Sequence, residues 1–380
     1  MKAIHFGAGK IGRGFIGAVL RKAGYDLTFV DVSKQLVDSI NKEQRYTIHI
    51  LDFDTYDETI DNIRAISTDS KELPALFDTA DIVTTAVSMT ALPQAAPLIA
   101  QGIRHRKKSL NNIPFNIISC ENGIRATTQL KGYTYAFLDS AEKTWADSHV
   151  GFADSSVDRI IPISSFDHPL DVAVESFYEW NIDKTQIKGT LPPIPDIHLT
   201  NNLTAHIERK LFTVNTGHCA IAFLGNIKGC KYIHECLADK EIKNTARNIM
   251  QQSGDALIAK FGFNRINHYK YIDVVLRRFT NPFIQDLTSR VGHDPRRKLS
   301  ANMYFSYPIS MASEYHLPTN YLSLAVAAGM KETIPGDSQC EEIHQLIKQK
   351  GITQAITDIT GHTESRIIQE IINAYQSLNP

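Results

Sequence analysis

A glycine-rich turn close to the N-terminus limits how this chain can fold more than any other feature. The turn follows a predicted strand at Lys2–Phe6 and opens a predicted helix at Ile11–Ala23. Its first glycine permits a tight turn, its second lets a diphosphate approach the backbone, and its third lets the helix lie close to the strand. The hexapeptide reads Gly7-Ala8-Gly9-Lys10-Ile11-Gly12. It predicts the start of a dinucleotide-binding sheet, with the diphosphate at the N-terminus of the helix.

Asp31 indicates which dinucleotide this turn binds. It ends a second predicted strand, Asp26–Val30, and lies nineteen residues after Gly12. A carboxylate at this place accepts hydrogen bonds from both ribose hydroxyls and repels a 2′-phosphate, so NAD is preferred over NADP. Val32 and Ser33 supply no arginine that could hold such a phosphate. The predicted cofactor-binding residues are those of the hexapeptide together with Asp31, Ala86 and Val87.

Strand-like and helix-like segments alternate through the first half of the chain, which predicts a parallel sheet with crossover helices. Gly24 is expected to cap the first helix. Tyr46–Leu51 alternates apolar and polar residues and is expected to add to the basic sheet. Further strands are predicted at Ile82–Ala86, Phe115–Ser119, Arg159–Ile163 and Val172–Phe177.

The pattern changes at Gly189–Ile197, where three prolines predict a stiff connection. Helical periodicity dominates beyond it, at Leu203–Leu224, Ile242–Phe261, Tyr269–Arg278, Tyr321–Ala328, Glu341–Lys350 and Ser365–Tyr375. The predicted fold class is therefore α/β: an N-terminal Rossmann dinucleotide-binding domain, residues 1–192, and a C-terminal, mostly α-helical domain, residues 193–380.

The composition excludes several classes of protein. The 380 residues carry a net charge of −1, so no global charge attracts nucleic acid or an anionic membrane. No apolar run is long enough for a transmembrane helix, and Lys10 and Arg13 interrupt any secretory signal. Five cysteines in a chain of this size form no disulfide framework. We expect a cytoplasmic protein that binds neither nucleic acid nor a membrane, as a monomer or a small homo-oligomer.

Cys230, His234 and Cys236 lie close to one another in sequence, near His218 and Cys219. Their spacing matches no standard zinc pattern, and isolated cysteines are more often small buried hydrophobic residues. We therefore predict no metal ligands.

Lys210, Asn215 and His218 form a candidate catalytic group on the first helix after the proline-rich connection. At about 100° per residue they fall within an arc of roughly 140°, so all three can face one cleft. Oxidation of an alcohol by hydride transfer needs a base for the hydroxyl proton and donors aimed at the oxygen. A lysine serves as that base once desolvation or neighbouring cations lower its pKa. Spacing alone is more typical of a polar stripe on an exposed helix face.

Two motifs resemble a known family. The segment Val150–Pro162, which contains Asp158 and Arg159, is similar to the signature of the polyol-specific long-chain dehydrogenases, the mannitol dehydrogenase family. The same family carries a Lys-x4-Asn-x2-His motif, which Lys210, Asn215 and His218 match. The resemblance implies a metal-independent mechanism with Lys210 as general base. It also implies that Asn122, in Ser-Cys-Glu-Asn-Gly, joins Asn215 in holding the substrate oxygen, although Asn-Gly is also a common turn.

Three longer segments resemble the branch of this family that acts on mannitol 1-phosphate. They are residues 1–17, 180–189 and 208–218. This branch implies reversible oxidation of D-mannitol 1-phosphate to D-fructose 6-phosphate, so the expected partner is a small-molecule sugar or alditol phosphate. The family pattern places an arginine and, eight residues later, a lysine against the polyol, which Arg290 and Lys298 match. Other basic clusters that can meet a phosphate are Lys184/Lys188, Arg277/Arg278 and Arg296/Arg297.

Three alternatives remain open. The substrate can be an unphosphorylated polyol or a hexuronate. The mechanism can depend on a metal. The chain can also be a non-catalytic NAD(H)-sensing module, in which the helical half binds a partner; the Lys-Asn-His motif argues against this, since a sensor needs no positioned base.

Overall fold

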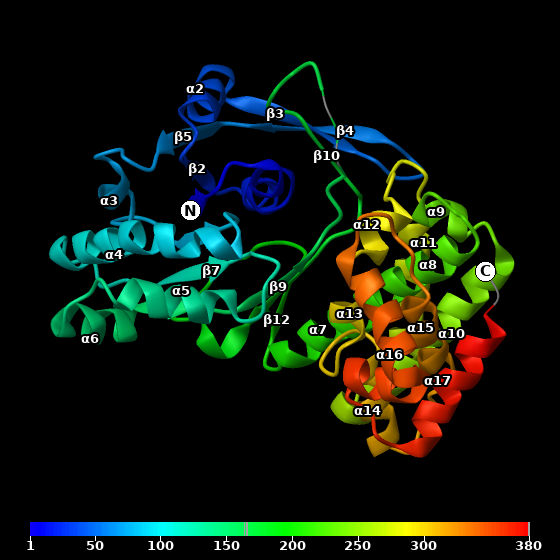
Figure 1. The fold of residues 1–380 in the computed structure, drawn as a ribbon. Coiled ribbons are helices and arrows are strands. Elements are labelled where there is room, and N and C mark those ends of the chain that lie inside the picture. The colour runs from blue at the N-terminus through cyan, green and yellow to red at the C-terminus, as the bar shows by residue number, and fades with distance from the viewer. Residues whose placement is uncertain (163, 165, 379–380) are drawn as a thin grey trace. The chain divides into compact units, whose positions relative to one another are not determined.

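A six-stranded parallel sheet organises the N-terminal part of the chain (Figure 1). Its order is β5-β2-β1-β6-β7-β8, which is the order of two mononucleotide-binding halves that meet between β1 and β6. The strands are β1 (Lys2–Phe6), β2 (Asp26–Asp31), β5 (Ile63–Ser67), β6 (Ile82–Thr85), β7 (Phe115–Ser119) and β8 (Val150–Phe152). All five pairings between neighbours are parallel. The predicted Rossmann sheet is confirmed.

The computed structural model describes residues 1–162, 164 and 166–378. The chain divides into two units, Met1–His206 and Ile207–Pro380. The proline-rich connection belongs to the first unit, because it leads into β12 (Ile197–Thr200), which pairs with β11 (Glu179–Asp183).

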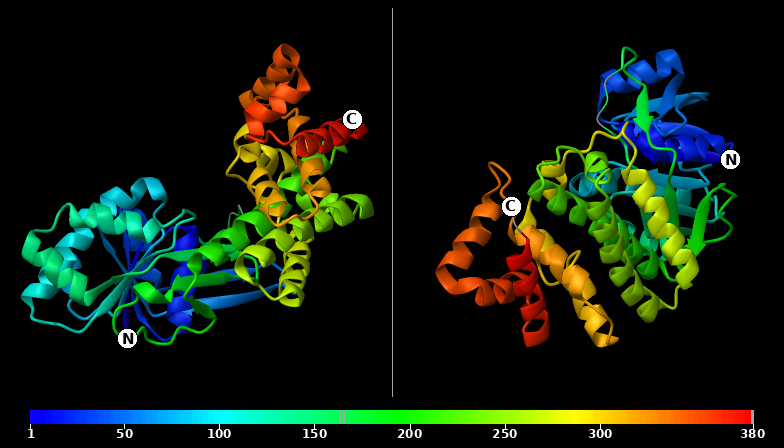
Figure 2. Two further views of the ribbon diagram at one scale, coloured as in Figure 1. Left: turned by 90° about the horizontal axis from the view of Figure 1, so that it is seen from below. Right: turned by 90° about the vertical axis from the view of Figure 1, so that its right-hand side faces the viewer.

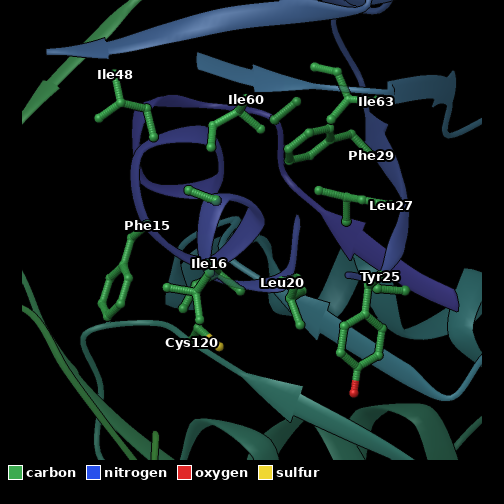
Figure 3. Close-up of a cluster of buried hydrophobic side chains, with 14 of the residues drawn as sticks. Phe15, Ile16, Leu20, Tyr25, Leu27, Phe29, Ile48, Ile60, Ile63 and Cys120 are labelled. Carbon is green, nitrogen blue, oxygen red and sulfur yellow. The ribbon is translucent and has the colours of Figure 1, made fainter. Parts of the chain in front are cut away.

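Helices cover both faces of the sheet, which explains why its central strands β6 and β7 are buried at every residue. Consecutive residues of β1 serve opposite faces: Ala3 packs into one buried cluster, and Ile4 into the other. The second cluster includes residues of α4 (Leu92–Lys108), α5 (Ala126–Tyr135) and α6 (Ser140–His149). Figure 3 shows the first cluster, in which Phe15, Ile16 and Leu20 of the first helix lie among Leu27, Phe29, Ile60 and Ile63.

The helix after the glycine turn has two parts, a π-helical turn η1 (Gly12–Gly17) and α1 (Ala18–Lys22). It lies within the predicted range Ile11–Ala23. Gly24 follows with φ +84°, a left-handed conformation that suits glycine at a helix end, as predicted.

Two three-stranded sheets accompany the main sheet in the described part of the first unit. One has the order β10-β3-β4 and the other β12-β11-β9. Their strands are β3 (Arg45–Ile50), β4 (Tyr56–Asp61), β9 (Ser155–Asp158) and β10 (Val172–Val174), together with β11 and β12. The predicted strand at Tyr46–Leu51 therefore exists, but it pairs with β4 and β10 rather than adding to the main sheet.

The predicted strand at Arg159–Ile163 is wrong for residues 159–162, and residue 163 lies outside the described residues. Strand β9 ends at Asp158, before this segment. Arg159 then donates from Nε and Nη2 to the Glu175 carbonyl oxygen, at 3.0 and 2.9 Å, and from Nη1 to the Gly14 carbonyl oxygen. Side-chain contacts hold this apolar run in place of a strand ladder. The predicted strand at Val172–Phe177 is shorter than expected and ends at Val174.

The second unit is helical in its described residues, as predicted (Figure 2). The long α10 (Lys240–Phe261) contacts α8 (Thr216–Ile227), α11 (Arg265–Phe279), α14 (Ser306–Glu314) and α15 (Asn320–Met330). The C-terminal helix α17 (Ser365–Ser377), drawn in red, lies against α15. The remaining helices are α7 (Leu203–Arg209), α9 (Ile233–Cys236), α12 (Thr288–Gly292), α13 (Pro295–Leu299) and α16 (Ser338–Thr360).

The predicted helix at Leu203–Leu224 is interrupted by a π-helical turn, η4 (Lys210–Asn215), between α7 and α8. The predicted helix at Glu341–Lys350 continues to Thr360 past a kink at Gly351, where φ is +78°. Among the described helices, none combines the length and apolar character needed to cross a membrane.

Candidate functional site

A cavity of about 600 Å³ opens at the carboxyl ends of β1, β2 and β6 in the first unit. Ligands of open α/β sheets bind at this edge, beside the point where the strand order reverses. Its lining residues are Phe6, Gly7, Gly9, Val30, Asp31, Val32, Thr68, Asp69, Ala86, Val87, Ala91, Gln94, Ala95 and Leu98. Gly7, Gly9, Asp31, Ala86 and Val87 were all predicted to bind the cofactor.

Each of the three positions in the turn is a glycine for a different physical reason. Gly7 has φ +97° and donates its N–H to the Val30 carbonyl oxygen at 2.8 Å, and a Cβ on it would lie 2.5 Å from the Ala86 carbonyl oxygen. A Cβ on Gly12 would lie 1.9 Å from the Gly7 carbonyl oxygen. A Cβ on Gly9 would meet no described atom within 4 Å. Gly7 and Gly12 are thus required by the turn itself, whereas Gly9 lies on its open side, where a diphosphate could approach.

The Asp31 carboxylate is anchored at the mouth of this turn. Its Oδ2 accepts the Ala8 N–H at 2.7 Å, and its Oδ1 accepts the Ser33 N–H at 2.9 Å. Carboxylate oxygens have further lone pairs, so Asp31 can still accept hydrogen bonds from ribose hydroxyls. Together with the open backbone at Gly9, this donor and acceptor set fits NAD.

The other predicted turn residues do not line the described cavity. Ala8 and Gly12 are buried, and Ile11 is exposed. The Lys10 ammonium donates to the Ser164 carbonyl oxygen at 2.7 Å. Their direct contact with the cofactor remains a prediction.

In the second unit, Lys210 begins η4, Asn215 ends it, and His218 follows in α8. A π-helical turn joins residue i to residue i+5, so Lys210 and Asn215 lie one turn apart on the same side. Through Phe212–Ala220, which the structure describes completely, every residue is buried except Asn215 and His218. Lys210 is likewise half-buried. Asn215 and His218 are therefore the accessible positions of this buried segment, and Lys210, one π-helical turn before Asn215, is half-buried like residues 206–211 around it.

His218 is tied to a carboxylate that the sequence analysis missed. Its Nε2 lies 3.0 Å from Oδ2 of the buried Asp286, and its ring stacks on Phe279 with 4.5 Å between centroids. The Oδ1 of Asp286 accepts from Nε of Arg290 at 2.8 Å and from its Nη2 at 2.5 Å. Burial alone would raise the pKa of Asp286, but the contacts with His218 and Arg290 outweigh it and lower that pKa. In the sequence, the signal for the Asp286–Arg290 pair was the four-residue spacing of these two residues, one before and one after the start of a helix.

The two predicted substrate-binding residues have different surroundings. The Arg290 side chain is 63% exposed, so its remaining N–H donors face solvent. Lys298 is buried, its ammonium donates to the carbonyl oxygens of Val291 at 2.6 Å and of His293, and burial lowers its pKa. These contacts place Lys298 at the C-terminal end of α12.

Asn122 lies in the first unit, in the turn after β7, and its side chain is exposed. The preceding residue, Glu121, is buried and accepts hydrogen bonds from the loop after β6. Lys210, Asn215 and His218 lie in the second unit. The four predicted catalytic residues thus come from both units of the chain.

Cys236, one of the cysteines near His218 in the sequence, has the surroundings of a small buried residue of the core. Cys236 is buried, its thiol donates to the Tyr232 carbonyl oxygen at 3.3 Å, and burial raises its pKa. A group of possible metal ligands lies elsewhere, at His293, Asp294 and Asp337, whose ligand atoms lie within 4.8 Å of one another.

Comparison with known proteins extends over nearly the whole chain. Residues 1–196 match the mannitol dehydrogenase Rossmann domain, and residues 202–379 match the mannitol dehydrogenase C-terminal domain. Among solved structures, the chain is similar to Pseudomonas fluorescens mannitol 2-dehydrogenase in a ternary complex with NAD and D-mannitol. That match has a TM-score of 0.71 at 19% identity, and it covers 100% of this chain and 92% of the other. A D-sorbitol dehydrogenase in substrate-free form gives a TM-score of 0.82 at 17% identity, over 98% of this chain and 92% of the other.

The two domain matches cover both units that the structure describes, in the same order along the chain. They also agree with the resemblance found at Val150–Pro162 and in the Lys-Asn-His motif. This chain belongs to the mannitol dehydrogenase family.

Proposed function

We propose that this protein is an NAD-dependent dehydrogenase that oxidises D-mannitol 1-phosphate to D-fructose 6-phosphate, reversibly and without a metal. One observation carries the chemistry: Asn215 and His218 are the accessible positions of a buried helical segment, and Lys210 lies one π-helical turn before Asn215. The choice of a phosphorylated substrate rests on the resemblance of residues 1–17, 180–189 and 208–218 to that branch of the family. Asn122, which the family resemblance adds to this group, belongs to the first unit.

Each residue has a role that its chemistry permits. NAD, when bound at Asp31 and Gly9, supplies the hydride acceptor. Lys210 accepts the hydroxyl proton at Nζ as the alcohol carbon loses its hydride. The amide N–H₂ groups of Asn215 and Asn122 donate to the same oxygen as charge develops on it.

His218 holds a neighbouring hydroxyl. Because its Nε2 faces the Asp286 carboxylate, the neutral tautomer carries its proton on Nε2, and Nδ1 is then an acceptor. An acceptor at this point selects a substrate hydroxyl rather than a carbonyl. Asp286 keeps the imidazole in this orientation, just as it holds Arg290.

Arg290 is the proposed phosphate ligand in the second unit. It is the more exposed of the two predicted substrate-binding residues and keeps donors beyond those that Asp286 uses. Arginine offers planar, bidentate recognition of a phosphate. Lys298 acts in this proposal by holding the end of α12, the helix that carries Arg290.

Steady-state oxidation of NADH with fructose 6-phosphate, fructose and tagaturonate tests the proposal. Fructose 6-phosphate should be the best substrate, and exhaustive chelation should leave its rate unchanged. The variant Lys210→Ala should lose roughly a thousandfold in turnover and bind NADH nearly as the wild type does. Lys228→Ala is the control, because Lys228 pairs with exposed Asp239 and Glu241 at the end of α8. Near-normal turnover by Lys210→Ala would reject the assignment.

An unphosphorylated polyol is the second candidate. The two similar solved structures are a mannitol 2-dehydrogenase in complex with NAD and D-mannitol and a D-sorbitol dehydrogenase, and Lys298, one of the two cations predicted to bind the substrate, is buried. Faster turnover of fructose than of fructose 6-phosphate would favour this candidate. Tight NADH binding without turnover of any sugar would favour a sensing module instead.

A further inference from the structure

Two loops at the carboxyl edge of the main sheet carry different parts of the proposed site. The loop after β6 contributes Ala86, Val87 and Ala91 to the lining of the cofactor cavity. The loop after β7 carries Asn122, the proposed ligand of the substrate oxygen. The chemistry requires a fixed spacing between these loops, because hydride transfer depends on the relative position of cofactor and substrate.

The Glu121 carboxylate joins the two loops. Its Oε1 accepts the Val87 N–H at 3.0 Å, and the Thr85 hydroxyl donates to Oε1 at 2.8 Å and to Oε2 at 2.9 Å. Glu121 is 6% exposed, and burial raises the pKa of its carboxyl group. A buried carboxylate is costly unless hydrogen bonds satisfy it, and these contacts with Thr85 and Val87 do so.

Two further features hold the same loops in one arrangement. Ser88, which follows Val87, has φ +91°, a conformation that residues other than glycine adopt only when their surroundings impose it. Gly123 packs against Met89, and a Cβ on Gly123 would lie 2.3 Å from the Met89 sulfur. The loop after β6 is therefore held on one side by Glu121 and on the other by Gly123, the two neighbours of Asn122.

The place of the loops after β6 and β7 in the main sheet indicates which part of the cofactor binds near them. Asp31 ends β2 and belongs to the half of the sheet that takes the adenosine. Strands β6 and β7 belong to the other half, which takes the nicotinamide nucleotide. Glu121 thus belongs to the half of the sheet that would take the nicotinamide nucleotide.

We propose that Glu121 is a positioning residue that sets the Val87 backbone, and with it the nicotinamide half of the cavity, relative to Asn122. It touches neither substrate nor cofactor and acts through Val87 and Asn122. The inference rests on the proposed function for the role of Asn122, but its effect on cofactor binding does not need a sugar substrate.

Binding of NADH and of ADP-ribose to the full-length protein tests this role. ADP-ribose has the adenosine and the diphosphate but no nicotinamide. The variant Glu121→Ala should weaken NADH by about tenfold and leave ADP-ribose binding within about twofold of the wild type. Turnover should fall as well, with a smaller change in KM for the sugar, since Asn122 acts on the developing charge.

Two further variants separate positioning from general damage to the fold. In Glu121→Gln the amide oxygen can still accept the Val87 N–H, and the amide N–H₂ can donate to the Thr85 hydroxyl, so most of the NADH affinity and turnover should return. Thr85→Val keeps the Val87 contact and removes one partner, so it should show a smaller loss of the same selective kind. This variant decides the matter if Glu121→Ala does not fold.

Equal losses of NADH and ADP-ribose affinity in these variants would overturn the inference, and so would unchanged affinity for both. A wild-type protein that binds NADH but turns over no sugar phosphate would reject the proposed function alone. The selective loss of NADH binding would then still stand as the test of Glu121.

Discussion

The imidazole of His218 lies 3.0 Å from the carboxylate of Asp286, and that same carboxylate holds the guanidinium of Arg290. A proposed catalytic residue and a proposed substrate-binding residue therefore share one buried anion. His218 contacts one oxygen of this carboxylate and Arg290 the other. This coupling makes Asp286 the residue whose replacement reports on both.

The variant Asp286→Asn should lower turnover by roughly ten- to a hundredfold. An asparagine that accepts from Arg290 through its oxygen turns its N–H₂ toward His218, which forces the imidazole proton onto Nδ1 and removes the acceptor proposed for the substrate hydroxyl. Steady-state kinetics measures the loss. Asp273→Asn breaks the exposed pair with Arg247 and serves as the control, with turnover near that of the wild type. Equal turnover of Asp286→Asn and this control would contradict the shared-anion account.

Asp286 also predicts a dependence of stability on pH. Its pKa is lower in the folded state, so its contribution to stability is present above the unfolded pKa of about 4 and is lost as the pH falls through the folded value. The difference in free energy of unfolding between wild type and Asp286→Asn should shrink on acidification in that range. Urea unfolding at a series of pH values measures it, and a constant difference would argue against an ionised Asp286.

Glu332 predicts a dependence of the opposite sign. Burial raises its pKa to about 8, against the hydrogen bond from Asn226 and the charge of Lys298, which lower it. Between pH 4.5 and 8 the unfolded chain releases this proton and the folded chain keeps it, so stability falls as the pH rises through that window. Glu332→Gln should therefore stabilise the protein more at pH 8 than at pH 5. Thermal unfolding at both values checks this, and equal shifts would reject it.

Substitutions of two glycines in the first turn should have different effects, one on the stability of the fold and the other on binding of the cofactor. Gly12→Ala should lower the free energy of unfolding by about 3 kcal/mol, because its Cβ would lie 1.9 Å from the Gly7 carbonyl oxygen. Gly9→Ala should leave the cofactor-free protein as stable as the wild type, because its Cβ meets no described atom within 4 Å, yet it should weaken NADH binding. Thermal unfolding with and without NADH distinguishes the two. Reversed behaviour would mean that the diphosphate does not lie at Gly9.

Arg290 and Lys298 should also differ. Arg290→Ala should raise KM for mannitol 1-phosphate by about tenfold or more and leave the unfolding temperature nearly unchanged. Lys298→Ala should lower the unfolding temperature, because the ammonium holds two carbonyl oxygens at the end of α12. Arg247→Ala, which removes one partner of the exposed pair with Asp273 and belongs to none of the basic clusters, is the control. A normal KM in Arg290→Ala would mean that one of the other basic clusters, and not Arg290, binds the phosphate.

Local patterns predicted those parts of the fold that depend on local physics. Strands β1 and β7 have the predicted bounds, because a buried parallel strand is a short segment rich in apolar residues whose end is marked by glycine or polar residues. The π-helical turn at Lys210–Asn215 escaped prediction, since the spacing of apolar residues does not distinguish it from an α-helix. The sheet to which β3 belongs also escaped, because its partner β10 lies far along the chain.

The residues of the candidate site divide in the same way, into those that a local sequence pattern predicts and those that depend on distant contacts. The glycine turn and Asp31 could be predicted because a single short motif carries their chemistry. Asp286 and Glu121 could not, because a carboxylate becomes informative only when the fold buries it against particular partners. Arg159 belongs to the family signature, yet its described hydrogen bonds go to backbone carbonyl oxygens of Gly14 and Glu175, and its guanidinium lies over the Tyr178 ring.

The most direct test of the account compares NADH oxidation with fructose 6-phosphate and with fructose on the same preparation of the wild-type protein. The account predicts a kcat/KM for fructose 6-phosphate that is higher by about a hundredfold or more, because Arg290 adds a charge-assisted contact to a phosphate. Equal values for the two sugars, or a higher value for fructose, would contradict it.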